Sequence, residues 1–315
     1  MDILTTSVVI RALNEGQHLG RLLEGLEKQS RAVDEVILVD SGSTDDTVEI
    51  AKNYGCRIVT IDKRDFSFGR ALNYGCEAAS GDVIILLSAH VYPVYDSYVQ
   101  NIVKPLETTK ATLVYGRQIG DHRTKLSERR IMKKWFPAGN VRAQSHPFCN
   151  NANAATLAST WNEFRYDESL TGLEDLDYAK RLSESGCEIG YAGDAPIVHV
   201  HEESWSQITN RYRREAIAHK RIYPAKQMSG PHAARLAAVN IVADWMEALR
   251  EGEFVSNASD VVRFRSSQFY GTWQGFRDPR PTHEQLMRRY YYPAELVDRG
   301  APDGIGTPIE YETRS

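Results

Sequence analysis

The sequence of 315 residues contains no run of eighteen apolar residues, so we expect no helix that spans a membrane. Its first six residues, MDILTT, lack the basic segment and the apolar segment of a secretory signal peptide. Cysteines are few and scattered, with no CxxC pair among them: Cys56, Cys76, Cys149 and Cys187. We therefore expect free thiols, no disulfide framework, and a protein of the reducing cytoplasm.

A strong excess of charge of either sign is also missing. The formal net charge is -4, whereas a domain that binds nucleic acid usually carries a basic face, so we expect no nucleic-acid partner. No GxGxxG motif joins the first predicted strand to the helix after it, which excludes the dinucleotide-binding fingerprint. With 42% hydrophobic and 25% charged residues, the composition is that of an ordinary globular protein.

What the sequence does contain is an alternation of short apolar strands and amphipathic helices. The apolar run Val83–Leu87 follows a Gly-Asp turn and predicts a strand buried on both faces. Further strands are predicted at Ser7–Ile10, Val36–Val39, Arg57–Ile61 and Thr112–Tyr115, and helices at Gly16–Ser30, Phe66–Ala79 and Tyr95–Leu106. This alternation predicts an α/β fold with a mostly parallel, Rossmann-like sheet flanked by helices.

The character of the chain changes near residue 203. Two long helices are predicted beyond it, Ser206–Tyr223 and Pro231–Gly252. An aromatic, loop-like tail is expected to follow, including Phe269–Phe276 and Tyr290–Pro293. We therefore predict an α/β domain of residues 1–203 and a C-terminal extension of helices and loops, residues 204–315.

Two acidic side chains stand where predicted strands end. Glu15, preceded by Asn14, follows the first strand, and Asp40 ends the second. The carboxyl ends of parallel strands form the ligand crevice of an open α/β sheet, where an acid can accept hydrogen bonds from ribose hydroxyls. Helix capping explains the presence of Asn14 equally well, but it does not require an acid at Asp40.

Four segments, in order, resemble the nucleotide-binding half of family 2 glycosyltransferases, enzymes of the GT-A fold. They are VVIRALNE from Val8, VILVDSGSTDD from Val36, GRALNYG from Gly69 and ASGD from Ala79. The resemblance implies that the chain transfers a sugar from a nucleotide-sugar donor and that Glu15 and Asp40 hold the nucleoside. It also implies that Asn14, Arg70 and Asn73 line the donor pocket.

The resemblance continues as far as residue 205. The segment GLEDLD from Gly172 resembles the family's Glu-Asp motif beside the acceptor, which implies that Asp175 is the catalytic base of an inverting transfer, with Glu174 next to it. Acids are also common in the first turn of any helix, because they suit its dipole. Asn150 and Asn151 are predicted to contact the acceptor or, alternatively, to form a buried turn network.

One position departs from the family pattern. The family ends its fourth strand in Asp-x-Asp, which meets a divalent cation and the donor diphosphate; this chain has Ser88-Ala89-His90 there. In one interpretation His90 replaces the metal-binding aspartate, and His199 and His201 complete a site for Mn²⁺ or Mg²⁺, of which imidazole suits Mn²⁺ better. We expect both of these histidines to reach the site only if their strand ends between them. In the other, cations such as Arg70 offset the diphosphate charge without metal. Both interpretations place Ser88 and Ala89 beside the donor.

The basic segments Leu126–Trp135 and Arg211–Arg221 have two interpretations. They dock an anionic membrane surface or a lipid-linked acceptor, or they are solvated helix faces. We expect a nucleotide-sugar donor, a glycan or lipid-linked glycan acceptor, and action in the cytoplasm or at the inner face of the membrane. Residues 204–315 are expected to shape the acceptor site or to form an oligomer contact.

The sequence argues against two rival functions. A nucleotidyltransferase requires a glycine-rich, basic loop after the first strand to hold a triphosphate, and Leu13–Gln17 lacks it. A non-catalytic nucleotide- or sugar-binding module has no need of a base, so the Glu174-Asp175 pair argues against it.

Overall fold

The computed structural model describes residues 3–62, 65–170, 172–224, 228–277 and 306–311. These residues contain one eight-stranded sheet with the order β3-β2-β1-β4-β7-β6-β8-β5. Its strands are β1 (Thr6–Ala12), β2 (Glu35–Asp40), β3 (Arg57–Thr60), β4 (Val83–Ser88), β5 (Val91–Pro93), β6 (Ala111–Ile119), β7 (Asn153–Leu157) and β8 (Glu188–His199).

The first four strands of the chain pair in parallel. β1 lies between β2 and β4, so Ala12 is opposite Asp40 and Arg11 is opposite Ser88. β7 runs antiparallel between β4 and β6, β6 and β8 are parallel again, and β5 adds an antiparallel edge. The predicted α/β fold is confirmed, and the carboxyl ends of β1, β2 and β4 lie side by side, as a ligand crevice requires.

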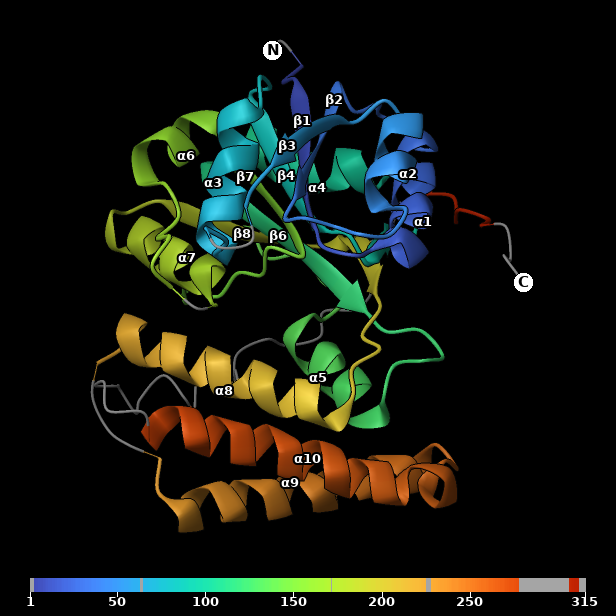
Figure 1. Cartoon of the computed structure of the whole chain (residues 1–315), viewed down its shortest axis with the longest axis vertical. Helices are drawn as coiled ribbons and strands as arrows, with labels where there is room; N and C mark the ends of the chain where they lie inside the picture. Colours follow the sequence, from blue (N-terminus) through green and yellow to red (C-terminus); the bar gives the residue numbers. More distant parts are fainter. Residues whose placement is uncertain (1–2, 63–64, 171, 225–227, 278–305, 312–315) are drawn as a thin grey trace.

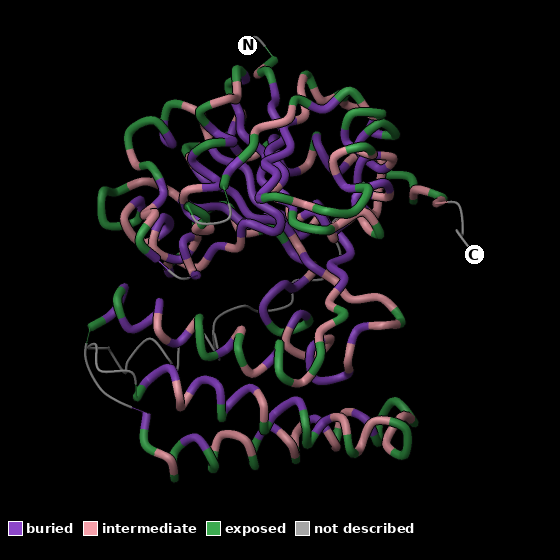
Figure 2. Tube along the Cα trace, viewed as in Figure 1, coloured by how far each residue is buried: buried purple, intermediate pink, exposed green. Residues whose placement is uncertain are grey.

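Helices cover both faces of the sheet because its buried strands are apolar on both sides (Figure 1). On β1, Val8 and Ile10 pack in the core layer of α1, α2 and α4, whereas Val9 packs in the layer of α3, α6 and α7. Figure 2 shows burial concentrated along the strands, and Val83–Leu87 is at most 1% exposed. The helices are α1 (Gly16–Glu27), α2 (Thr47–Asn53), α3 (Phe68–Ala78), α4 (Tyr98–Thr108), α6 (Ala158–Phe164) and α7 (Glu174–Glu184).

A second layer of helices lies beyond the carboxyl ends of the strands (Figure 1). It consists of α5 (Leu126–Trp135), α8 (Trp205–Ile222), α9 (Gly230–Arg250) and α10 (Phe254–Arg277). α5 precedes residue 203 in sequence but packs with α9 and α10, so this helical layer is built from both sides of the predicted domain boundary.

The expectation of a loop-like tail at Phe269–Phe276 was wrong, because these residues form the last two turns of α10. Gly271 and Gly275 lower the helix propensity of this segment, since glycine usually interrupts helices. In the structure, a β-carbon on Gly271 would collide with the carbonyl of Thr209, and one on Gly275 with the carbonyl of Arg213. The two glycines, one turn apart, therefore allow α10 to pack closely against α8. The other predicted aromatic cluster, Tyr290–Pro293, lies outside the described residues.

A buried ionic cluster holds the helical layer together. Asp244 of α9 is 0% exposed and accepts hydrogen bonds from Ser127 Oγ of α5 at 2.6 Å and from Arg265 Nε of α10 at 2.7 Å. It is also paired with Arg130 of α5. Arg265 is itself 3% exposed, so its charge depends on Asp244 for compensation.

Replacing Asp244 with alanine is expected to lower the free energy of unfolding by about 3–5 kcal/mol, because it leaves the buried Arg265 charge unpaired. Chemical denaturation measures this. The matched control is Glu251→Ala at the end of α9, where a half-exposed carboxylate lies 3.8 Å from Arg129; its expected effect is about 1 kcal/mol or less. Equal losses for the two variants would show that the ionic cluster does not hold the helices together.

The described end of the chain returns to the α/β layer. Residues 306–311 lie along β5, where Ile309 N donates to Val94 O at 3.0 Å and the Tyr311 hydroxyl donates to the carbonyl of Pro93. All four cysteines are free, as expected. No helix among the described residues is both long enough and apolar enough to cross a bilayer.

Candidate active site

The loops after β1 and β2 are tied to each other at the crevice. Asn14 adopts a left-handed backbone conformation (φ 56°), and its Oδ1 accepts the N–H of Thr44 at 2.8 Å. Asp40, which is buried, accepts the N–H groups of Gly42 and Ser43. Asn14 thus holds the second loop in place, and the capping interpretation was wrong, because the N-cap of α1 is Glu15 and no side chain caps that helix.

Glu15 connects this loop pair to the end of β4. Its N–H donates to Thr47 Oγ1 at 2.7 Å, and its Oε1 lies 2.9 Å from Nδ1 of His90. Ala89 is fully buried and Ser88 is partly buried, whereas the ring of His90, which follows them, lies against Glu15. The residue predicted to hold the nucleoside and the residue predicted to bind metal are therefore direct neighbours.

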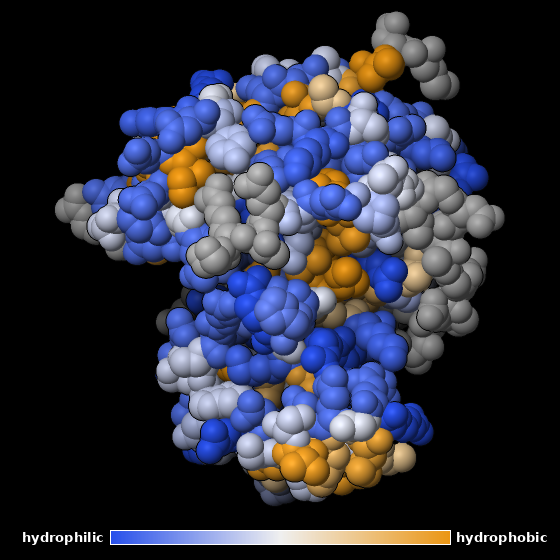
Figure 3. Space-filling model, turned by 90° about the vertical axis from the view of Figure 1, so that its right-hand side faces the viewer, coloured by the Kyte–Doolittle hydropathy of each residue, from blue (hydrophilic) through white to orange (hydrophobic). Residues whose placement is uncertain are grey.

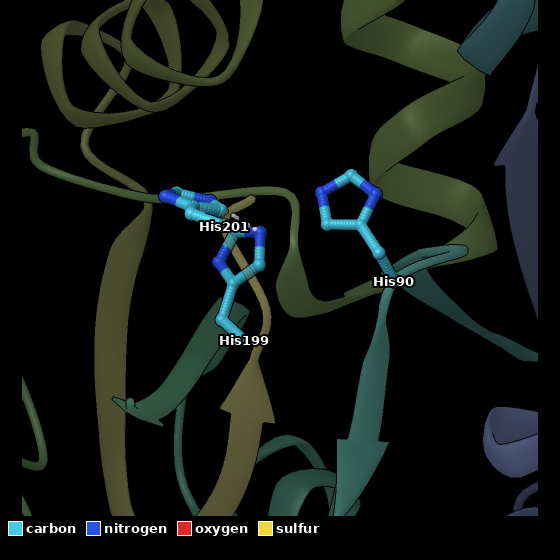
Figure 4. A group of neighbouring side chains, drawn as sticks. All are labelled: His90, His199 and His201. Carbon is cyan, nitrogen blue, oxygen red and sulfur yellow. Dashed lines mark hydrogen bonds between the residues drawn. The ribbon is translucent and has the colours of Figure 1, made fainter. Parts of the chain in front are cut away.

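His90 lies against two further histidines, which come from the end of β8 (Figure 4). The ring centroids of His90 and His199 are 5.0 Å apart and nearly parallel, and Nε2 of His199 lies 2.8 Å from Nε2 of His201. β8 ends at His199, between the two residues, which is the condition under which both rings were expected to reach the site. Ring nitrogens of all three histidines lie within 4.8 Å of one another.

These imidazoles fit a divalent transition-metal ion. Burial, together with the charges of His201 and His90, holds the pKa of His199 well below its usual range, so its ring is in the neutral form that binds metals. Glu128, His201 and Glu203 form a second group with ligand spacing. Arg211 pairs with both carboxylates there, at 2.8 and 2.7 Å, so we interpret that group as an ion-pair network.

Asp175 lies in the first turn of α7. Its carboxylate accepts the N–H groups of Leu176 at 2.8 Å and Asn151 at 3.2 Å. Burial and the nearby charge of Glu174 raise the pKa of Asp175 to about 7, against the lowering effect of those two hydrogen bonds. Glu174 is buried and pairs with Arg11 at 3.3 Å, so the two acids differ: one is neutralised by an arginine and the other is poised to take up a proton.

Asp175, His199 and His201 line one cavity of about 410 Å³ between the sheet and the helical layer. Asn150 also reaches it. Much of the remaining wall is apolar, from Ile131, Met132, Trp135, Phe136, Phe148 and Phe269. A carboxyl group with a raised pKa beside a histidine cluster, in a cavity with apolar walls, has the properties of an active site.

The side chains of two other predicted residues, Asn73 and Arg70, already form hydrogen bonds or ion pairs within the protein. Asn73 is buried and uses its amide fully, donating to Tyr166 O and Glu168 Oε1 and accepting from Trp161 Nε1 and Tyr166 N. Arg70 forms a 2.7 Å ion pair with Glu168. Their predicted contact with a donor stays a prediction, and what they do in this structure is fix the segment after α6.

Sequence reasoning missed the residues behind the histidines. Gln118 at the end of β6 lies 2.7 Å from Nδ1 of His199, and Glu128 of α5 lies 2.6 Å from Nδ1 of His201. Glu128 is the single acid in the basic segment Leu126–Trp135, which was a weak signal of a special role. No local pattern joins residues that are 73–81 positions apart.

Similar folds occur among solved glycosyltransferases. The mannosyltransferase PcManGT from Pyrobaculum calidifontis, solved with GDP-Man and Mn²⁺, aligns with a TM-score of 0.56 over 87% of this chain and 84% of that chain, at 16% identity. S. aureus TarS 1-349, solved with UDP, aligns with a TM-score of 0.53 over 84% of this chain and 90% of that chain, at 15% identity. The fold is therefore that of a GT-A glycosyltransferase.

The sequence comparison defines the family. Residues 7–161 match the model of glycosyl transferase family 2, so the chain carries a family 2 glycosyltransferase domain, as the resemblance implied. The O-antigen chain rhamnosyltransferase RfbN of Salmonella typhimurium is 24% identical over 227 residues, which cover 68% of this chain and 72% of RfbN.

Proposed function

We propose that this glycosyltransferase moves a sugar from a nucleoside diphosphate donor to a hydroxyl group of a glycan or lipid-linked glycan, with inversion at the anomeric carbon. The observation that carries the proposal is the path of direct contacts from Glu15 through His90 and His199 to the cavity that holds Asp175. The name of RfbN and the ligands of the two aligned structures support a nucleotide-sugar donor and an O-antigen type of acceptor.

The donor would bind along the carboxyl ends of β1, β2 and β4. Asp40 and Glu15, which follow neighbouring strands, would accept hydrogen bonds from the ribose, and Ser88 and Ala89 would border the diphosphate. His90, His199 and His201 would hold a divalent cation, with Mn²⁺ favoured over Mg²⁺ because imidazole is a poor ligand for magnesium. Such an ion offsets the charge of the departing nucleoside diphosphate.

Asp175 would act on the acceptor from across the cavity. Its carboxylate takes the proton of the attacking hydroxyl while the new bond to the anomeric carbon forms and the bond to the diphosphate oxygen breaks. Asn151 N–H and Leu176 N–H hold that carboxylate in position. The apolar part of the cavity wall suits the less polar parts of an acceptor.

An apolar part of the described surface is a candidate for the predicted oligomer contact of residues 204–315. Figure 3 shows apolar atoms gathered at the end of the molecule formed by α9 and α10. The exposed side chains there are Val239, Val242, Met246, Leu249 and Val255. Action in the cytoplasm, at the inner face of the membrane, belongs to this proposal as well.

A thermal-shift screen tests the donor part of the proposal. One nucleoside diphosphate is expected to raise the melting temperature by about 2 °C or more at saturation, and to do so more strongly with Mn²⁺ than with EDTA. Binding without sugar transfer to any glycan acceptor would favour a nucleotide-binding module. A shift that ignores the cation would remove the metal from the proposal, and no shift with any nucleotide would contradict it as a whole.

The raised pKa of Asp175 predicts a pH dependence. A base must be deprotonated to act, so kcat/KM for the acceptor is expected to fall about tenfold per pH unit below about pH 7 and to level off above it. Initial rates between pH 5 and 9 measure this. An acidic limb near pH 4, the ordinary range of an aspartate, would show that the base titrates as an ordinary carboxylate and would contradict the raised pKa of Asp175.

A further inference from the structure

The three histidines are each held through Nδ1 by an oxygen acceptor. Glu15 Oε1 lies 2.9 Å from Nδ1 of His90, Gln118 Oε1 lies 2.7 Å from Nδ1 of His199, and Glu128 Oε1 lies 2.6 Å from Nδ1 of His201. A histidine that binds a metal usually donates its other ring N–H to a carboxylate or carbonyl, which fixes the tautomer and the ring orientation.

The proton on His201 is located by its partner. Glu128 accepts from Arg211 Nη2 at 2.8 Å, so its carboxylate is ionised beside a permanent cation and acts as an acceptor. His201 must then carry its hydrogen on Nδ1. In the neutral ring, Nε2 is left with a lone pair that points at His199.

The proton on His199 is located by a longer chain of contacts. The backbone N–H of Ala152 donates to Oδ1 of Asn150 at 3.0 Å, which fixes that atom as an oxygen. Gln118 Nε2 donates to the same oxygen at 2.9 Å, so the opposite atom of the Gln118 amide is its carbonyl. Nδ1 of His199 therefore donates to Gln118, and Nε2 of His199 also carries a lone pair.

Two lone pairs thus face each other across the 2.8 Å between the Nε2 atoms. In the neutral rings this contact is repulsive, and either a proton on one Nε2 or a cation bound to both atoms relieves the repulsion. Two imidazole nitrogens at the usual metal–nitrogen distance of about 2.0–2.1 Å, in adjacent positions at a right angle, are about 2.9 Å apart. The spacing therefore fits two ligands of one metal ion.

We propose that Gln118 and Glu128 are positioning residues that lock His199 and His201 as Nε2 ligands and thereby set the affinity of the site for a transition-metal ion. The inference rests on the cation of the proposed function. Gln118 comes from β6 and Glu128 from α5, so this arrangement couples metal affinity to the docking of the helical layer on the sheet.

The test measures Mn²⁺ affinity of the full-length protein by electron paramagnetic resonance. Gln118→Met removes the acceptor at nearly constant volume and is expected to weaken Mn²⁺ binding about 10- to 100-fold. Gln118→Glu keeps an acceptor oxygen and is expected to stay within about threefold of wild type. Co²⁺ bound to wild type and to Gln118→Met is expected to give different visible absorption spectra, because a ring free to change tautomer changes the ligand set.

The matched control is Gln29→Met, which removes an equally buried glutamine whose amide donates to the Gly25 and Tyr95 carbonyls at the other end of α1. It is expected to lower stability without changing Mn²⁺ affinity.

Wild-type affinity in Gln118→Met overturns the inference while leaving the metal site intact. Failure of the wild-type protein to bind Mn²⁺ contradicts the proposed cation itself. If Gln118→Met does not fold, Glu128→Met, which removes the acceptor of His201, is the second variant, and unchanged Mn²⁺ affinity in it overturns the role of Glu128.

Discussion

Replacement of Asp175 with asparagine is expected to lower kcat for sugar transfer by about 10²- to 10⁴-fold, the usual contribution of a general base. The amide cannot take up the hydroxyl proton, whereas its size and its contacts with Asn151 and Leu176 are retained. Donor affinity should be unchanged, since the donor is proposed to bind through Glu15 and Asp40 rather than through Asp175. Nucleoside diphosphate release with acceptor present, and calorimetric binding of the donor, measure the two quantities.

The control for this variant is Asp177→Asn in the same first turn of α7. Asp177 forms a 2.8 Å pair with Arg181 on the helix surface, away from the cavity, and its replacement should change kcat less than about twofold. Transfer at the wild-type rate in Asp175→Asn would remove Asp175 from the mechanism. An equal loss in both variants would indicate damage to α7 rather than loss of a base.

Replacement of His199 with alanine is expected to abolish high-affinity Mn²⁺ binding and to lower transfer by about 10²- to 10³-fold. Charge stabilisation by a bound metal is worth several kcal/mol, and each 1.36 kcal/mol corresponds to tenfold in rate. His199 is the central residue, because its ring contacts both His90 and His201. Calorimetry with Mn²⁺ and initial rates over a range of Mn²⁺ concentrations measure the effect.

His232→Ala, an exposed residue in the first turn of α9, is the matched control and should bind Mn²⁺ as wild type does. Partial recovery of His199→Ala at high Mn²⁺ would support a weakened site. If His199→Ala retains both Mn²⁺ affinity and activity, the cation binds elsewhere or is not used. The metal-free alternative, in which arginines offset the diphosphate charge, would then be favoured.

The α/β half of the molecule was predictable because its signals are local. Val83–Leu87 has no polar residue, and a strand of that composition must be covered on both faces. Carboxyl ends of neighbouring parallel strands share an edge, so the proximity of Glu15 and Asp40 also followed from the pattern. The end of α10 was mispredicted because Gly271 and Gly275 satisfy a contact with another helix, which no local rule detects.

The sequence predicted which histidines belong to the candidate site, but not the residues that hold them by hydrogen bonds. His90, His199 and His201 were assigned to one site on the resemblance alone, and the structure brings them together. Their partners Gln118 and Glu128 are polar residues with no motif around them, and tertiary packing alone makes them neighbours of the histidines. At Asn73 the motif did not reveal that the side-chain amide already forms hydrogen bonds within the protein, and its contact with a donor stays a prediction.

The most direct test of this account is a crystal structure of the protein with Mn²⁺ and the nucleoside diphosphate that binds best, using the anomalous scattering of manganese. We expect an anomalous peak next to the diphosphate, within coordination distance of Nε2 of His90, His199 and His201. The ribose is expected to lie at Asp40 and Glu15. A nucleotide bound in the crevice without a manganese peak at these three nitrogens, or a peak at other residues, would contradict this account.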